Sequence, residues 1–273
     1  MSLNRHLLDN IAIVLMRPKY PENIGAAARA AWNMGLTRII VVADEYPDHD
    51  RMAMMATHNA AHLLDSMEFH QDLGEALKPF SQVVATTARR GRQRVLKNSP
   101  RDVMEIILPL LPENQVAFLF GPEDSGLTND DLKYSQLISA VPTADFSSLN
   151  LAQAVGIHCY EIYQAVVHNQ KKVNSAPKIA SSFELEGMYE HVEKALLQVD
   201  FLQEKSHSYY MRNIRQLLSR IRLNSKEASL IRGICRQFLW HTSNPTDPLT
   251  PPKKTTPVNK LPADKNKSPL QIR

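Results

Sequence analysis

The sequence contains little of what would tie it to an oxidising compartment, a membrane or a thiolate metal site. Only two cysteines occur among 273 residues, Cys159 and Cys235, and they form no Cys-x-x-Cys pair. A disulfide framework or a thiolate zinc site therefore has no support, and we expect two buried thiols. No apolar run approaches the roughly 20 residues that span a bilayer, and the amino terminus lacks the apolar core of a secretion signal. The sequence thus predicts a cytoplasmic protein that does not associate with membranes.

Two ligand-binding signatures are also missing. The sequence has no Gly-x-Gly-x-x-Gly fingerprint, which disfavours a conventional dinucleotide-binding Rossmann loop. His58 and His62 have the i, i+4 spacing of helical metal ligands, but no acidic or cysteine partner stands near them in a recognisable pattern. We therefore expect no metal site.

The pattern of apolar runs indicates an α/β fold with a parallel sheet. With 43% apolar residues, the chain can form one α/β domain and a smaller unit. Strand-sized apolar runs without strict alternation, typical of strands buried on both faces, occupy residues 11–16, 38–43, 82–86, 116–120 and 137–141. Helix-period segments lie between them at residues 23–34, 51–64, 72–78, 100–110 and 128–134. This alternation predicts a doubly wound sheet.

The remaining chain divides into a closing helix, a linker, a helical unit and a tail. Residues 148–169 predict a long helix capped by Ser148, with an apolar face made of Leu149, Ala152, Val155, Ile157, Tyr160 and Ile162. We expect a domain at 1–170, a linker at 171–179, a basic helical domain at 180–240 and a disordered tail at 241–273. The helical domain is expected to hold helices at 182–198, 208–222 and 225–240, each with a capping serine.

Three polar clusters follow predicted strands and are the candidates for chemistry. They read Asn-Ile-Gly-Ala-Ala-Ala-Arg at 23–29, Phe-Gly-Pro-Glu-Asp-Ser-Gly-Leu-Thr at 120–128 and Ser-Ser-Leu-Asn-Leu-Ala-Gln-Ala-Val at 147–155. Loops at the carboxyl edge of a parallel sheet are where open α/β folds bind ligands. Taken singly, each cluster has an ordinary alternative: a small-residue packing face, a turn or a helix cap.

A fourth candidate is a run of arginines just past the strand that ends at Thr86. It consists of Arg89, Arg90, Arg92 and Arg94. Arginines concentrated beside a predicted site favour contact with a phosphate backbone, and a solvated loop is the alternative.

Together and in this order, the clusters resemble the SPOUT methyltransferases of the TrmH (SpoU) class. The three family motifs match Asn23, Gly25 and Arg29, then Gly121, Glu123 and Gly126, then Ser148, Leu149 and Asn150. The resemblance covers about residues 9–170. Beyond the linker, residues 211–237 are similar to the helical extension of the TrmJ branch of that class.

The resemblance implies a fold, a cofactor and an assembly. The parallel sheet of this class carries a deep carboxyl-terminal trefoil knot, an exception to the rule that chains do not thread loops. The knot loops would hold S-adenosylmethionine through Thr86, Thr87, Ala88, Gly121, Val141, Ser148 and Leu149. The enzyme would be a homodimer in which Arg29 completes the partner's site.

The resemblance also implies a reaction. The TrmJ branch methylates the ribose 2′-hydroxyl of the cytidine or uridine at position 32, the first nucleotide of the tRNA anticodon loop. Asn23, Arg29, Glu123, Ser148 and Asn150 are then the expected catalytic set. We expect tRNA backbone contacts from the helical domain, carried by Arg212, Arg215, Arg220 and Arg232.

The role of Arg29 needs a physical argument, because a guanidinium stays protonated and is a poor base. We expect Arg29 to stabilise the developing alkoxide and to grip the adjacent phosphate, with Glu123 as the alternative base. Ribosomal RNA as substrate, a non-catalytic RNA-binding paralogue, and a helical domain that mainly dimerises remain the alternative interpretations.

Overall fold

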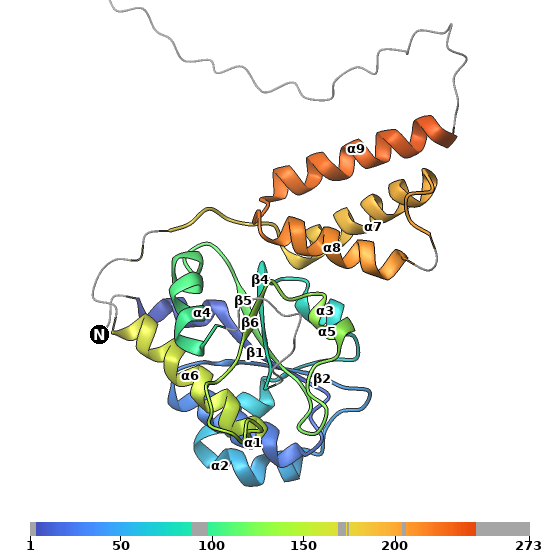
Figure 1. The fold of residues 1–273 in the computed structure, drawn as a ribbon. Helices are drawn as coiled ribbons and strands as arrows, with labels where there is room; N and C mark the ends of the chain where they lie inside the picture. Colours follow the sequence, from blue (N-terminus) through green and yellow to red (C-terminus); the bar gives the residue numbers. More distant parts are fainter. Residues whose placement is uncertain (1–3, 89–97, 169–172, 174, 204–205, 244–273) are drawn as a thin grey trace, which may run out of the picture.

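The structure is a computed structural model that describes residues 4–88, 98–168, 173, 175–203 and 206–243. Within these ranges six strands form one sheet in the order β3-β2-β1-β5-β4-β6, and every strand pair is parallel (Figure 1). The strands are β1 (Ile11–Met16), β2 (Arg38–Val42), β3 (Glu68–His70), β4 (Gln82–Thr86), β5 (Val116–Phe120) and β6 (Leu137–Ser139). The helices of the sheet domain are η1 (Arg5–Asn10), α1 (Pro21–Asn33), α2 (His49–Asp65), α3 (Leu73–Leu77), α4 (Pro100–Ile107), η2 (Leu108–Leu110), α5 (Asn129–Leu132) and α6 (Leu151–Val167).

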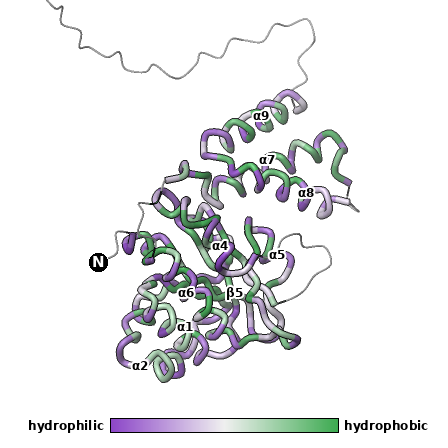
Figure 2. Tube along the Cα trace, turned by 60° about the vertical axis from the view of Figure 1, so that its left-hand side comes forward, coloured by the Kyte–Doolittle hydropathy of each residue, from purple (hydrophilic) through white to green (hydrophobic). Residues whose placement is uncertain are grey.

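Helices cover both faces of the sheet, which explains why the strands are continuous apolar runs. Along β1, Ile11, Ile13 and Leu15 pack into the layer that includes side chains of α1, α2, α4 and α6. The alternate residues of β1 pack on the other face, with residues of α3 and α5. Because successive side chains of a strand point to opposite faces, both sets must be apolar. Figure 2 shows hydrophobic and hydrophilic residues alternating along the helices that surround the sheet.

The end of β6 is bound to both ends of the connection that leaves β4. The Thr87 N–H donates to the carbonyl of Ser139 at 3.0 Å, and the Ala140 N–H donates to the carbonyl of Asn98 at 2.9 Å. The chain at the end of β6 therefore lies beside both Thr87 and Asn98. This placement accords with the knot that the family resemblance implies.

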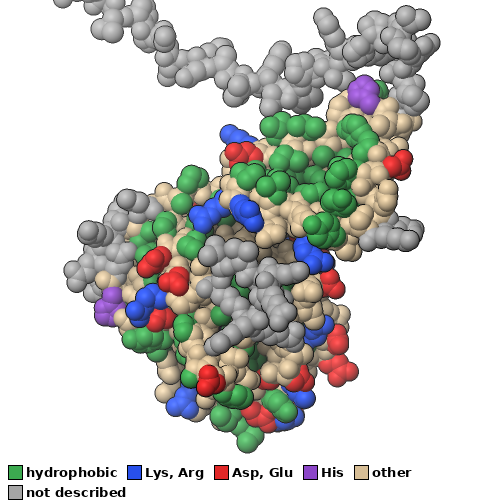
Figure 3. All heavy atoms as spheres, viewed as in Figure 1, with side chains coloured by type: hydrophobic (Ala, Val, Ile, Leu, Met, Phe, Trp, Pro, Cys, Tyr) green, Lys and Arg blue, Asp and Glu red, His purple; other side chains and the backbone are tan. Residues whose placement is uncertain are grey.

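The last three helices form a separate unit: α7 (Ser182–Gln198), α8 (His207–Ser219) and α9 (Ser225–Ser243). They share a small core of Ala180, Met188, Tyr189, Leu223 and Ala228. Figure 1 shows this unit beyond one end of the sheet domain, and Figure 3 shows apolar side chains exposed over it.

The helical unit is anchored at the amino edge of the sheet. The N–H and the hydroxyl of Ser182 both donate to the carbonyl of Phe80, just before β4, at 2.8 and 2.9 Å. The buried side chain of Asn114, just before β5, accepts a hydrogen bond from the Ile179 N–H at 2.9 Å. The unit thus lies at the end of the strands opposite to their carboxyl ends.

Most predicted elements are confirmed, and the errors concern short or terminal segments. The strand β3 was not predicted, β2 ends at Val42 and β6 ends at Ser139. The expected disorder from residue 241 is wrong for residues 241–243, which continue α9; residues 244–273 lie outside the described ranges. None of the described helices has the length and apolar character needed to cross a bilayer.

The start and the face of α6 differ from expectation. Asn150 caps the helix in place of Ser148, because its Oδ1 accepts from the N–H groups of Ala152 and Gln153 at 2.9 and 3.3 Å. The predicted apolar face is wrong for Ile157 and Tyr160, which are 36% and 47% exposed. Serine is likewise not the capping residue of α9, where the Asn224 side chain accepts from the N–H groups of Lys226 and Glu227.

Candidate active site

One hydrogen-bonded network joins the three polar clusters at the carboxyl edge of the sheet. The Asn23 amide donates to Oε1 of Glu123 at 2.6 Å, and the Asn150 amide donates to Oδ1 of Asn23 at 3.0 Å. Oε2 of Glu123 accepts from the Lys19 N–H at 2.8 Å. Asn23 is separated from Glu123 and Asn150 by 100 and 127 positions in the chain, so the fold alone brings them together.

The donors and acceptors of this network fix the orientation of each asparagine amide group. The two carboxylate oxygens of Glu123 accept hydrogen bonds, so Asn23 presents its NH₂ group to Glu123 and its oxygen to Asn150. Asn150 must then donate through its own NH₂ group, which leaves its oxygen to cap α6. Each asparagine therefore uses both ends of its amide, and one change at any member disturbs the others.

Glycines allow the first two clusters to close tightly. A Cβ at Gly25 would lie 1.9 Å from the carbonyl oxygen of Met52, so only glycine permits the observed contact between α1 and α2. A Cβ at Gly121 would lie 2.4 Å from the Leu127 nitrogen. Gly126 has a φ of 63° and its N–H donates to the Pro122 carbonyl at 2.9 Å, which closes the loop that carries Glu123.

The segments expected to hold a cofactor leave neighbouring strands. Residues 86–88, Gly121 and Val141 follow β4, β5 and β6, which are adjacent in the sheet. The Thr86 hydroxyl donates to the Leu119 carbonyl at 3.1 Å, which ties the end of β4 to β5. Leu149 lines a shallow apolar depression of about 430 Å³ with Gln153, Gly156, Ile157 and Tyr160 of α6.

His158 of α6 contacts the end of β6 at this edge of the sheet. No feature of the sequence pattern indicated a role for this residue. Its ring is buried and makes edge-to-face contacts with Phe118 and Phe120 of β5, and burial lowers its pKa to about 4. Nδ1 lies 2.8 Å from the Ala154 carbonyl, which can only accept, so Nδ1 carries the proton and Nε2 accepts from the Ser139 hydroxyl at 2.9 Å. Because the Ser139 carbonyl holds Thr87, the neutral imidazole positions the start of the loop after β4.

Two models of known protein families match the parts of the chain that form the sheet domain and the helical unit. A model described as the SpoU rRNA Methylase family matches residues 10–160, and one described as the tRNA methyltransferase TrmJ, C-terminal domain, matches residues 183–247. The chain belongs to the SpoU methylase family, in its TrmJ branch. The resemblance drawn from the three motifs and the expected fold class are thereby confirmed.

Individual relatives cover most of this chain and nearly all of their own length. The tRNA (cytidine/uridine/adenosine-2′-O-)-methyltransferase TrmJ of Pseudomonas aeruginosa is 35% identical over 241 residues, which is 84% of this chain and 93% of the relative. The tRNA (cytidine/uridine-2′-O-)-methyltransferase TrmJ of Salmonella typhimurium is 35% identical over 239 residues, covering 84% and 96%. The crystal structure of TrmJ from Z. mobilis ZM4 superposes with a TM-score of 0.72 at 33% identity, covering 84% of this chain and 98% of that one.

The arginine of the first SpoU motif lies apart from the network. Arg29 is exposed on α1, whereas Ala27, Ala28 and Ala31 of that helix are buried. Arg29 makes no hydrogen bond or ion pair with any residue that the structure describes. Its side chain is therefore available on the molecular surface and takes no part in holding Asn23, Glu123 and Asn150 together.

The arginines expected to bind RNA fall into three groups. Arg89, Arg90, Arg92 and Arg94 lie outside the described residues. Arg212, Arg220 and Arg232 are exposed on α8 and α9 or at their ends. Arg215 forks onto both carboxylate oxygens of Glu186, stacks 4.3 Å above the Tyr189 ring and leaves only 20% of its side chain exposed, so the geometry gives it a structural role inside the helical unit.

The described ranges contain no group of three or more histidine, cysteine or acidic side chains arranged to hold a metal ion. His62 instead packs edge-to-face against Trp32, with ring centroids 4.4 Å apart.

Proposed function

We propose that this protein transfers a methyl group from S-adenosylmethionine to the ribose 2′-hydroxyl of the pyrimidine at position 32 in the tRNA anticodon loop. The network that joins Asn23, Glu123 and Asn150 carries the proposal, since it assembles all three SpoU motifs at one edge of the sheet. The TrmJ relatives of Pseudomonas aeruginosa and Salmonella typhimurium, named as tRNA 2′-O-methyltransferases, support it. We place this activity in the cytoplasm.

The segments at the carboxyl edge fit S-adenosylmethionine. When bound, this cofactor supplies a methyl group activated by a sulfonium leaving group. Thr86, Thr87 and Ala88 after β4, Gly121 after β5 and Val141 after β6 form adjacent strand exits, with Ser148 and Leu149 leading into α6. The Thr87 N–H and the Thr86 hydroxyl donate to backbone carbonyls of the neighbouring strands β6 and β5. These hydrogen bonds fix the end of β4 before any ligand binds.

The hydrogen bonds support a proposal with two different roles for the expected catalytic residues. Both oxygens of Glu123 already accept hydrogen bonds, from Asn23 and from the Lys19 N–H, so we assign Glu123 to positioning and not to proton removal. Asn150 and Ser148 orient the approach to α6. The exposed Arg29 is left to stabilise the developing alkoxide and to contact the neighbouring phosphate, as an orienting charge.

The exposure of Arg29 on α1 supports a second proposal, that it acts in the site of a second copy of the chain. We propose a homodimer built on the outer surfaces of α1 and α6, because α6 exposes Ile157 and Tyr160 beside the depression lined by Leu149. Trp32, on α1, is 40% exposed as well. Apolar side chains of this size on a helix surface favour a protein partner over water. Such a dimer would bring Arg29 of one subunit to the network of the other.

We propose that the helical unit adds affinity for tRNA. Its exposed arginines would contact phosphates, and such contacts weaken steeply as salt rises. A chain ending before residue 175 should therefore bind tRNA more weakly and with a smaller salt dependence. Unchanged tRNA binding after this deletion would refute a role in tRNA affinity and would favour dimerisation as the main role of the helical unit.

The decisive experiment maps ribose methylation in total tRNA incubated with the protein and S-adenosylmethionine. We expect one new 2′-O-methyl group at position 32, and Arg29→Ala should abolish it while S-adenosylmethionine affinity survives. Lys78→Gln, a change of exposed charge at the amino edge, serves as the control that keeps activity. Methylation of ribosomal RNA alone, or full turnover by Arg29→Ala, would refute the substrate or the role of Arg29, respectively.

A further inference from the structure

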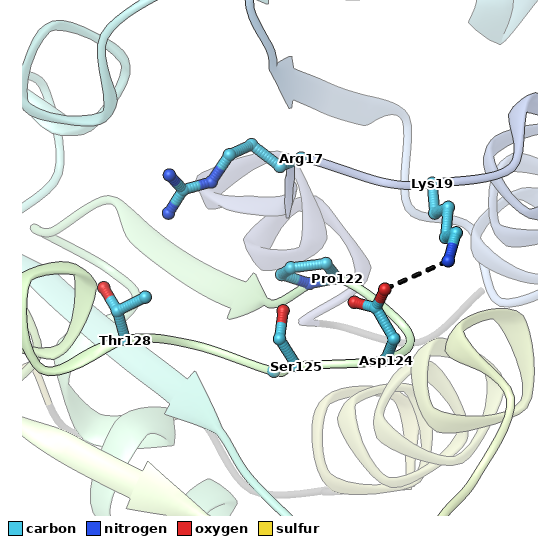
Figure 4. A pocket seen from close by; sticks show the side chains of 7 residues that line it. Arg17, Lys19, Pro122, Asp124, Ser125 and Thr128 are labelled. Carbon is cyan, nitrogen blue, oxygen red and sulfur yellow. Dashed lines mark hydrogen bonds and ion pairs between the residues drawn. The ribbon is translucent and has the colours of Figure 1, made fainter.

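We infer that a cavity next to the catalytic network is a binding site for an RNA backbone phosphate, with Arg17 and Lys19 as its cationic groups. The cavity has a volume of about 480 Å³ at the exits of β1 and β5. It is lined by Arg17, Lys19, Pro122, Asp124, Ser125, Gly126 and Thr128. Figure 4 shows Arg17 and Lys19 on one side of it and the hydroxyl-bearing side chains of Ser125 and Thr128 on the other. This inference rests on the proposed function and extends it to the substrate backbone.

The Arg17 guanidinium is anchored at one nitrogen, which leaves the rest of the group for a ligand. Only Nη2 contacts Asp131, at 3.0 and 3.1 Å from its two oxygens. Among the described residues, Nη1 and Nε of Arg17 have no hydrogen-bond partner, and the side chain is 46% exposed. A guanidinium held in this way can still donate hydrogen bonds to phosphate oxygens from Nη1 and from Nε, one on each side of the anchored Nη2.

The backbone at Arg17 also singles out this position. Its φ is 47°, in the left-handed region that costs a side-chain-bearing residue free energy and that glycine adopts freely. The Arg17 N–H donates to the Val42 carbonyl at 2.7 Å, so neighbouring strand β2 holds the conformation. An arginine at a position whose backbone conformation glycine adopts more readily points to use of its side chain.

Lys19 is held by a contact that a phosphate can replace. Its ammonium lies 3.1 Å from Asp124, and the two side chains are 51% and 58% exposed. Asp124 raises the pKa of Lys19, chiefly through their hydrogen bond, so the ammonium is charged when RNA arrives. Exposed ion pairs are weak in water. Asp124 therefore keeps Lys19 pointed at the cavity in the absence of RNA without competing strongly with a phosphate.

The cavity and the catalytic network share a segment of chain. The Lys19 N–H donates to Glu123, and Glu123 lies between two residues that line the cavity, Pro122 and Asp124. An RNA strand whose target ribose lies at the network would therefore place a flanking phosphate near Arg17 and Lys19. Contacts of this kind fix the register of the strand and carry no base information.

The test measures binding of an unmodified anticodon stem-loop RNA to the full chain over a range of salt concentrations. Lys19→Gln should weaken binding about fivefold at 0.1 M salt and lower the slope of log K against log salt by about 0.7, the value for one single-strand phosphate contact. Asp124→Asn frees Lys19 and should tighten binding. Lys78→Gln is the matched control, because Lys78 pairs with Glu75 and the two side chains are 43% and 57% exposed; it should leave affinity unchanged.

Three outcomes would overturn the inference: unchanged RNA affinity in Lys19→Gln, an equal loss in Lys78→Gln, or a loss of S-adenosylmethionine affinity in place of RNA affinity. The last outcome would assign the cavity to the cofactor. The unmodified chain is assayed for methyl transfer in parallel. If it methylates tRNA while Lys19→Gln binds RNA normally, the phosphate site is wrong and the proposed function stands; absence of methyl transfer by the unmodified chain refutes the function itself.

Discussion

The two tasks of Asn150 can be separated by substitution. Its oxygen caps α6 and its NH₂ group donates to Asn23. Asn150→Asp keeps an acceptor that caps as well as asparagine does, but it cannot donate. We therefore expect unchanged stability and a large loss of methyl transfer from this single change.

The magnitudes follow from the contacts. Loss of an asparagine cap costs about 1 kcal/mol, so Asn150→Ala should lower Tm by about 2–4 °C, whereas Asn150→Asp should stay near the unmodified value. The carboxylate introduced by Asn150→Asp would face the Asn23 oxygen, so Asn23 must turn or move away. Misplacement of a positioning group by about 1 Å can cost roughly 100-fold in rate, and we expect a fall of that order in single-turnover methylation.

Asn224 offers a matched control, because it caps α9 through the same kind of contact, far from the carboxyl edge. Asn224→Ala should lose stability as Asn150→Ala does and keep the methylation rate at saturating tRNA. The measurements are thermal unfolding and single-turnover transfer for the three variants and the unmodified chain. Methylation by Asn150→Asp within about twofold of the unmodified rate would refute the directed network, since a misplaced positioning group should cost far more.

Two further predictions concern stability. Gly25→Ala should destabilise the protein by about 1–3 kcal/mol, since the new Cβ would overlap backbone of α2, whereas Gly233→Ala, with no atom within 4 Å of the new Cβ, should stabilise it by up to about 1 kcal/mol; equal effects in thermal unfolding would contradict this. His158 stays neutral in the folded chain down to a pKa of about 4, whereas the unfolded chain takes up its proton near pH 6.5. The unfolded state thus binds more protons between these values, so His158 should subtract about 1.4 kcal/mol of stability per pH unit as pH falls from 6.5 to 4. Denaturant titrations of His158→Gln, compared with the unmodified chain, should show a shallower pH dependence; parallel curves would refute it.

The sequence was most informative where local and tertiary requirements coincide. Strands β1, β4 and β5 begin and end where predicted, because strands covered on both faces must be uninterrupted apolar runs. The strand β3 has three half-buried residues and, among the described strands, pairs with β2 alone, so it leaves no such run. Its existence depends on pairing with β2, which no local pattern reports.

The cap of α6 shows a second kind of limit. Ser147, Ser148 and Asn150 are all good capping residues, and propensity alone does not rank them reliably. Asn150 is the residue that reaches both partners, because its NH₂ group donates to Asn23 while its oxygen accepts from the N–H groups of Ala152 and Gln153. The position of the cap therefore depends on a residue 127 positions away.

Gly25 shows a third limit, because the sequence indicates close packing at this residue without identifying the partner element. In the sequence, a glycine among alanines indicates a small-residue packing face and does not say which element packs against it. The structure assigns the close contact to α2, through the Met52 carbonyl. Residues of one motif therefore serve two different purposes. Asn23 belongs to the hydrogen-bonded network of the site, and Gly25, two residues later, allows α1 to pack against α2. Arg29, a further turn along α1, is exposed and forms no hydrogen bond or ion pair with the network or with α2 among the described residues, which supports the proposal that it acts in a partner subunit.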